Sequence, residues 1–199
     1  MRVDFGDRHS PCFDMDQHRA LVRVGPLTLG ITGAAMNLDV VRNFLSLPTD
    51  KRAWGKEGWS VIRDPSAFLS IDWGEETEEI VLAWNRIAGS DLTVVAEILD
   101  FEGLAGYTHK LTLGERTLYV PYVGSREDCF IAVLTLNQLV EATVDMRFCQ
   151  DSVGNSDLCF LPLLPTHWSD FEAEFGKEMI DRRFRKLPRN FEDFEAYLL

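Results

Sequence analysis

Acidic side chains are concentrated in one stretch of this sequence, which includes the run EETEE. Between residues 64 and 105, ten carboxylates stand against a single cation, Arg86. Such a group of carboxylates attracts basic proteins and pairs with their Lys and Arg side chains. Two flanking tryptophans could supply the apolar anchors that protein interfaces need. The residues expected to contact a basic partner are Asp72, Trp73, Glu75, Glu76, Glu78, Glu79 and Trp84.

The same acids are also typical of a solvated surface that only keeps a protein soluble. The whole chain carries 32 acidic and 20 basic residues, for a net charge of -12. A field of this sign repels nucleic acid and anionic membrane surfaces. We therefore expect neither of them as a partner.

A cluster near the N-terminus has residue types that ligate metal ions. Its members are His9, Cys12, Asp14, Asp16 and His18. Their spacing matches no structural zinc pattern, and Pro11 leaves the local geometry open. A polar segment without a metal is the expectation.

Catalysis would have to use a site of unfamiliar form. The sequence lacks GxGxxG, GxxxxGK[ST], HExxH, GxSxG and the EF-hand loop, so no cofactor and no catalytic residue are predicted. His109 and His167 remain as general bases that a hydrolase could combine with Asp or Glu.

Two cysteines lie on opposite arms of a predicted hairpin, Cys149 and Cys159. The length of the connection decides whether they face each other. A disulfide or redox pair is one interpretation, and two buried free thiols acting as small apolar residues is the other.

Cations gather in two further segments. Residues 51–59 interleave Lys and Arg with Trp54 and Trp59, a pattern that can stack on bases or sugars, or can anchor a loop into its own core. Residues 182–189 form a basic patch, which the dipole at a helix C-terminus explains.

The elements that must position these residues follow from periodicity and turn signals. Alternating or β-branched runs predict strands over 20–32, 93–101, 107–113, 117–123, 144–150 and 158–163. The Gly-Pro interruption makes 20–32 either two short strands or one bent edge strand. Helical spacing predicts helices over 38–47, 129–142 and 168–184 and a last turn after Asn190, with Asn37 as an N-cap and a break at Gly176. Residues 129–142 could also be a strand followed by a short helix. Residues 50–65 are predicted as an exposed loop.

Hairpins without regular βαβ alternation predict an α+β fold, with an antiparallel or mixed β-sheet built from hairpins and helices packed on one side. No linker or low-complexity stretch divides the chain, so we expect residues 1–199 to form a single compact domain. The sequence has no secretory leader pattern, no apolar run of about 18 residues and no CxxC spacing. These features favour a cytoplasmic protein with reduced thiols.

The leading hypothesis is an acidic cytosolic protein that docks a basic protein partner. In size, acidity and lack of catalytic motifs, the chain is similar to immunity proteins, which protect bacteria from their own secreted nuclease toxins. That similarity implies an inhibitor of a bacterial toxin, although no diagnostic motif carries it. The alternatives are a hydrolase with an unrecognised Asp/Glu/His site and an assembly protein of a phage or secretion system.

Overall fold

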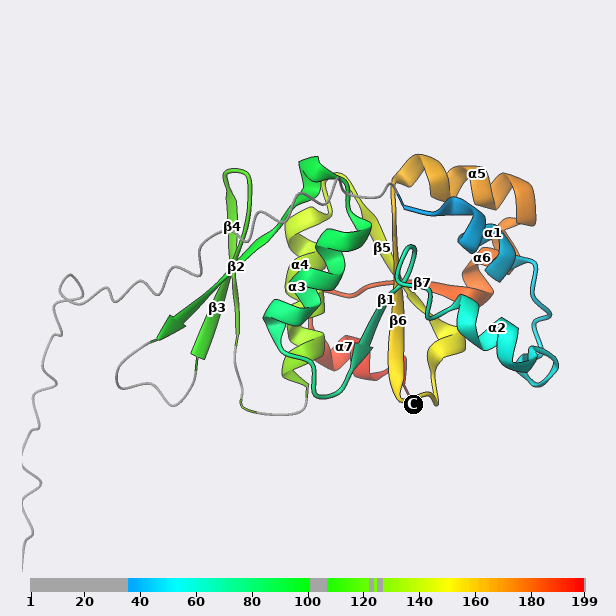
Figure 1. Ribbon diagram of the computed structural model, residues 1–199, viewed down its shortest axis with the longest axis horizontal. Helices are drawn as coiled ribbons and strands as arrows, with labels where there is room; N and C mark the ends of the chain where they lie inside the picture. Colours follow the sequence, from blue (N-terminus) through cyan, green and yellow to red (C-terminus); the bar gives the residue numbers. More distant parts are fainter. Residues whose placement is uncertain (1–35, 101–106, 122–123, 125–126, 199) are drawn as a thin grey trace, which may run out of the picture.

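The computed structural model describes residues 36–100, 107–121, 124 and 127–198 of the chain. Within these ranges lie seven α-helices and seven β-strands, which form two antiparallel sheets (Figure 1). The α+β class built from antiparallel hairpins is therefore confirmed. The strand predicted over 20–32 and the cluster from His9 to His18 lie outside the described residues.

The larger sheet has four strands and is the centre of the molecule. In spatial order they are β1 (Leu69–Asp72), β6 (Asp157–Leu163), β5 (Asp145–Cys149) and β7 (Phe184–Lys186). The predicted hairpin supplies its two central strands, with Phe148 opposite Phe160. Strand β1 comes from far away in the sequence and pairs Ile71 with Leu158.

Helices cover both faces of this sheet (Figure 1). On one face lie α1 (Leu38–Leu45), α2 (Gly55–Val61), α5 (Pro165–Phe175) and α6 (Lys177–Arg183). On the other lie α3 (Thr77–Ile87), α4 (Asp128–Val140) and α7 (Phe191–Glu195).

Two core clusters result, because successive strand residues point to opposite faces. Phe148 and Phe160 belong to the cluster that contains Phe194 of α7, whereas Cys149 and Cys159 belong to the cluster under α1 and α5. A nearly continuous apolar strand such as β6 is typical of a strand buried on both faces.

The smaller sheet consists of β2 (Val95–Asp100), β3 (Tyr107–Leu113) and β4 (Arg116–Val120). Its β3–β4 hairpin places Leu111 opposite Leu118, and the turn contains Gly114 at a φ of 56°. Helices α3 and α4 pack against this sheet. The prediction of helices on one side only does not hold for the larger sheet, because its central strands are apolar on both faces and helices cover both of them (Figure 1). Val95 and Tyr119 are exposed.

Helix α4 lies between the two sheets, together with α3 (Figure 1). This position explains why its sequence is apolar nearly all round, and a single buried helix is confirmed over the strand-plus-helix alternative. The caps were also predictable: the side chain of Asn37 accepts a hydrogen bond from the backbone N–H of Asp39, and that of Asn190 accepts one from Asp193. Gly176, at a φ of 88°, separates α5 from α6 as expected.

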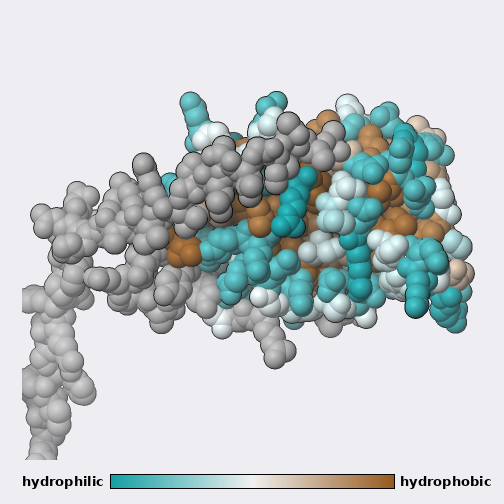
Figure 2. All heavy atoms as spheres, in the orientation of Figure 1, coloured by the Kyte–Doolittle hydropathy of each residue, from teal (hydrophilic) through white to brown (hydrophobic). Residues whose placement is uncertain are grey.

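The prediction of an exposed loop over residues 50–65 is wrong, because this segment is largely helical. It contains a single 3-10 turn, η1 (Lys51–Ala53), and helix α2. Trp54 anchors this segment because its ring is buried and its indole N–H donates to the carbonyl of Pro48. In Figure 2, hydrophilic residues dominate the visible surface of the described part, and apolar residues show between them. No helix in that part is long and apolar enough to cross a bilayer.

Candidate functional site

The acid run forms the junction between β1 and α3. Asp72 ends the strand, and its Oδ1 accepts a hydrogen bond from the backbone N–H of Trp73 at 2.6 Å. Glu76 is the N-cap of α3, and Oε2 of Glu79 reaches back to the backbone N–H of Glu76 at 3.2 Å. Carboxylates are favoured here because the first turn of a helix presents unpaired N–H groups and the positive end of the helix dipole.

Trp73 lies among these carboxylates and is 40% exposed. One edge of its ring packs on Phe130 of α4, with centroids 4.7 Å apart and planes at 84°. The side chain is thus held by the core while part of its ring faces solvent. Asp72, Glu76 and Glu79 are exposed beside it, and Glu75 is half-buried. We call Asp72, Trp73, Glu75, Glu76 and Glu79 the acidic face.

The carboxylates of the acidic face are not neutralised by the rest of the described chain. Among the residues that the structure describes, no ion pair involves Asp72, Glu75, Glu76 or Glu79. Their carboxylates accept hydrogen bonds from backbone N–H groups instead. Burial raises the pKa of Glu75, and the carboxylates of Glu79, Asp72 and Asp157 raise it further, against a hydrogen bond from the backbone N–H of Asp72. The carboxylates of the acidic face therefore repel one another.

Two of the predicted contact residues have other roles. Trp84 is 1% exposed and donates its indole N–H to the carbonyl of Leu92 at 2.9 Å. A partner cannot reach it, so the expectation that Trp84 anchors a partner is corrected: it packs α3 into the core. Glu78 points to the smaller sheet, where its Oε2 lies 3.1 Å from Nε2 of His109.

Sequence reasoning missed one acid beside the face, Asp157. It lies opposite Asp72 in the β1–β6 pair, and its carboxylate is 3.8 Å from the guanidinium of Arg63. The predicted hairpin placed Asp157 in the connection before the strand over 158–163, whereas β6 begins at Asp157. Only the long-range pairing with β1, which no local pattern shows, brings it next to Asp72.

The histidines and cysteines do not assemble a recognisable catalytic group in the described chain. His109 and Glu78 meet, whereas Nδ1 of His167 is buried without a hydrogen-bond partner among the described residues. Cys149 and Cys159 are free thiols, which settles the open alternative about a disulfide. Burial raises the pKa of Cys159 to about 11, which makes it a poor nucleophile. The described ranges contain no group of three residues able to hold a metal ion.

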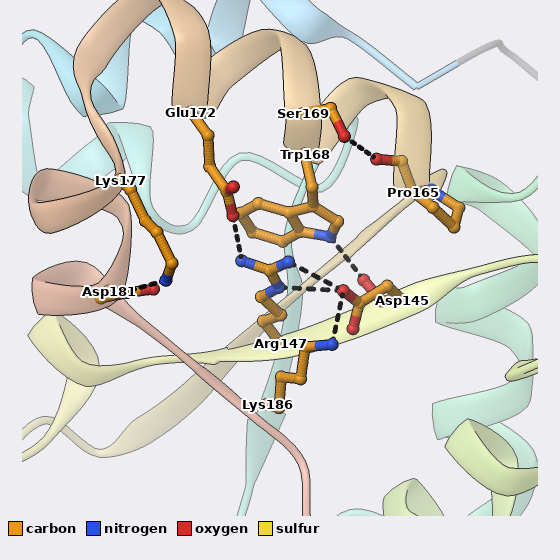
Figure 3. A network of polar contacts seen from close by, with 9 residues as sticks. All are labelled: Asp145, Arg147, Pro165, Trp168, Ser169, Glu172, Lys177, Asp181 and Lys186. Atoms are coloured by element: carbon orange, nitrogen blue, oxygen red, sulfur yellow. Dashed lines mark hydrogen bonds and ion pairs between the residues drawn. The ribbon is translucent and has the colours of Figure 1, made fainter.

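A buried arginine network is the other feature that sequence reasoning missed (Figure 3). The guanidinium of Arg147, on β5, stacks on the ring of Trp168 at 4.0 Å. Its Nε and Nη2 donate to Asp145 at 3.0 and 2.9 Å, and its Nη1 donates to Glu172 at 3.3 Å. An arginine between the apolar residues Met146 and Phe148 was the available signal, because a buried arginine needs acidic partners.

A pocket of about 540 Å³ opens beside this network. Its charged lining consists of three cations and three carboxylates: Arg147, Lys177, Lys186, Asp145, Glu172 and Asp181. Ion pairs within the pocket engage all six, including Lys177 with Asp181 and Lys186 with Asp145. The charges are thus balanced internally, and the network joins α5 to strands β5 and β7 of the sheet.

No protein-family model, curated protein or solved structure matches this chain. Its function has to be inferred from its own residues.

Proposed function

We propose that this chain is a binding protein whose acidic face docks a basic protein. The observation that carries the proposal is the group of carboxylates without cationic partners in the described chain, set around the half-exposed ring of Trp73. An aromatic anchor at the centre with charged groups at the rim is the usual anatomy of a protein interface.

The acidic face is ordered before a partner arrives. Phe130 fixes the ring of Trp73, and backbone N–H groups fix the carboxylates of Glu75 and Glu79. Groups that are already held in place lose less conformational freedom on binding, so more of the interaction energy appears as affinity.

Electrostatics also favours a cationic occupant. Burial raises the pKa of Glu75 and the neighbouring carboxylates raise it further, which means that ionising this residue carries a cost of desolvation and of repulsion. A Lys or Arg side chain placed against Glu75 and Glu79 would relieve that cost. The negative field would also speed the encounter, and this acceleration weakens as salt is added.

The finer proposal is an immunity-type inhibitor of a bacterial toxin that acts in the cytoplasm. Nucleases bind the phosphate backbone through Lys and Arg, so a toxin of that class presents the basic surface that the acidic face would complement. The free thiols of Cys149 and Cys159 suit a reducing compartment.

The test is capture from a lysate of the source cells on three immobilised proteins. These are the wild type, the acidic-face variant Glu75→Gln/Glu76→Gln/Glu79→Gln, and the control variant Glu115→Gln/Asp170→Asn/Glu178→Gln. Glutamine keeps the oxygen that accepts each backbone N–H, so the variant retains the caps of α3. The control removes three charges from exposed residues elsewhere.

We expect the wild type and the control to recover the same basic protein at low salt and to release it at high salt. The acidic-face variant should lose it. Equal recovery by both variants would contradict the proposal.

A further inference from the structure

A second pocket, of about 530 Å³, brings together the two cationic segments of the sequence. Its lining residues are Thr49, Asp50, Lys51, Arg52, Asp151, Arg182 and Arg183. They come from η1, from the end of α6 and from the connection between β5 and β6. We call this the basic pocket.

Arg183 is the buried cation of the basic pocket and is 1% exposed. Its guanidinium lies 4.8 Å from the ring centroid of Phe44 and 5.7 Å from that of Trp54. Nη1 donates to Asp151 at 3.0 Å, and Nη2 donates to the carbonyl of Leu47. Nε is buried and has no hydrogen-bond partner among the described residues. The guanidinium is therefore fixed in place by packing and by a single carboxylate.

The described chain neutralises the other three cations only in part, because one of the three, Arg52, forms an ion pair. Nζ of Lys51 donates to the carbonyls of Asp151 and Val153 at 3.1 and 3.2 Å, and both acceptors are neutral. Arg52 forms an ion pair with Asp50, to which the Nε of its guanidinium donates a hydrogen bond at 3.0 Å. Arg182 has no ion pair within the described ranges.

Charge balance distinguishes this pocket from the one beside Arg147. The basic pocket is lined by four cations and two carboxylates, an excess of two positive charges in a chain whose net charge is -12. The pocket beside Arg147 is lined by equal numbers of each. Cations gathered in one concavity repel one another, and a bound anion relieves that repulsion, so this concavity favours an anionic ligand.

We propose that the basic pocket binds the phosphate group of a small ligand. Phosphate carries a charge of about -2 near neutral pH, which matches the excess in the lining. The exposed guanidinium groups of Arg52 and Arg182 can each donate two hydrogen bonds to phosphate oxygens, and Lys51 adds a point charge. The volume lies within the range usual for small-molecule sites. The ligand is either a free phosphate or pyrophosphate ion or the phosphate end of a nucleotide.

Isothermal titration calorimetry tests this proposal with four probes: inorganic phosphate, pyrophosphate, ADP and adenosine. The pocket variant is Arg52→Gln/Arg182→Gln, which leaves the buried Arg183 intact and so preserves the fold. The control is Arg86→Gln/Arg185→Gln, which removes the same charge from two exposed residues outside the pocket.

We expect the wild type and the control to bind pyrophosphate and ADP, and the pocket variant to bind them at least about tenfold more weakly, because it loses two charge-assisted donors. Tighter binding of ADP than of pyrophosphate would assign a nucleotide, and equal binding would assign the phosphate group alone. Absence of binding at millimolar phosphate, pyrophosphate and ADP, or equal binding by the pocket variant and the control, would overturn the proposal. These residues are separate from the acidic face, so either proposal can fail alone.

Discussion

Glu78 and His109 connect helix α3 to the smaller sheet: Oε2 of Glu78, in the first turn of α3, lies 3.1 Å from Nε2 of His109 on β3. His109 is buried, and Glu78 covers it from the solvent side. Glu78 thus differs from Glu76 and Glu79, because its carboxylate contacts a side chain that can carry positive charge, whereas theirs contact backbone N–H groups.

This contact predicts a stability role for Glu78. Glu78→Gln and His109→Asn should show a coupling of about 0.5–1 kcal/mol in a double-mutant cycle measured by urea unfolding, since the pair is partly exposed. Glu78→Gln alone should leave the affinity for a basic partner almost unchanged. Strictly additive effects of the two substitutions would show that the contact contributes nothing.

Arg183 should matter more for stability than its neighbour Arg182. Arg183→Ala removes a buried cation and leaves Asp151 without its ion-pair partner, and breaking a buried pair costs about 3–5 kcal/mol. Arg182→Ala removes an exposed side chain and should change the free energy of unfolding by less than about 0.5 kcal/mol. Chemical denaturation compares the two. Similar losses for both would contradict the assignment of Arg183 to the core.

Glu75→Gln should raise the Tm at pH 7. Burial and neighbouring carboxylates raise the pKa of Glu75 above its ordinary value of 4.5. The stability linked to its protonated form is therefore present below pH 4.5 and is lost as pH rises through the raised pKa. The amide cannot ionise, so the gain should be small at pH 7, within about 1 kcal/mol, and absent well below pH 4.5. A Tm difference that does not change with pH would exclude this explanation.

The buried thiols should be inert in the native protein. Burial raises the pKa of Cys159 from 9.0 to about 11 and raises that of Cys149 as well. Both should resist iodoacetamide at neutral pH and react after unfolding, as peptide mass spectrometry would show. Because the folded pKa of Cys159 lies above the unfolded one, its contribution to stability is complete below pH 9 and is lost as pH rises through about 11. Labelling of native Cys159 at the rate of a free thiol would contradict its burial.

Local patterns predicted much of the fold. The apolar run of α4 and the alternation in the β3–β4 hairpin were visible in the sequence, and so were the caps at Asn37 and Asn190, because each depends on residues a few positions apart. The pairing of β1 with β6 depends on contacts between residues nearly ninety positions apart, so no short window could reveal it.

The candidate site shows the same limit. Clustering of acids located the acidic face, but the burial of Trp84 and the position of Asp157 depend on how α3 and β1 pack in three dimensions. The basic pocket also needed the fold, since Arg52 and Arg182 are distant in sequence and line one pocket only in the folded chain.

The most direct test of the central claim is the Kd of the purified partner for the two matched variants, measured at low and at physiological salt. We predict that Glu75→Gln/Glu76→Gln/Glu79→Gln weakens binding at least about tenfold at low salt, and that the difference shrinks as salt screens the charges. The control Glu115→Gln/Asp170→Asn/Glu178→Gln should bind within about threefold of the wild type. Equal affinities for the two variants would contradict the account.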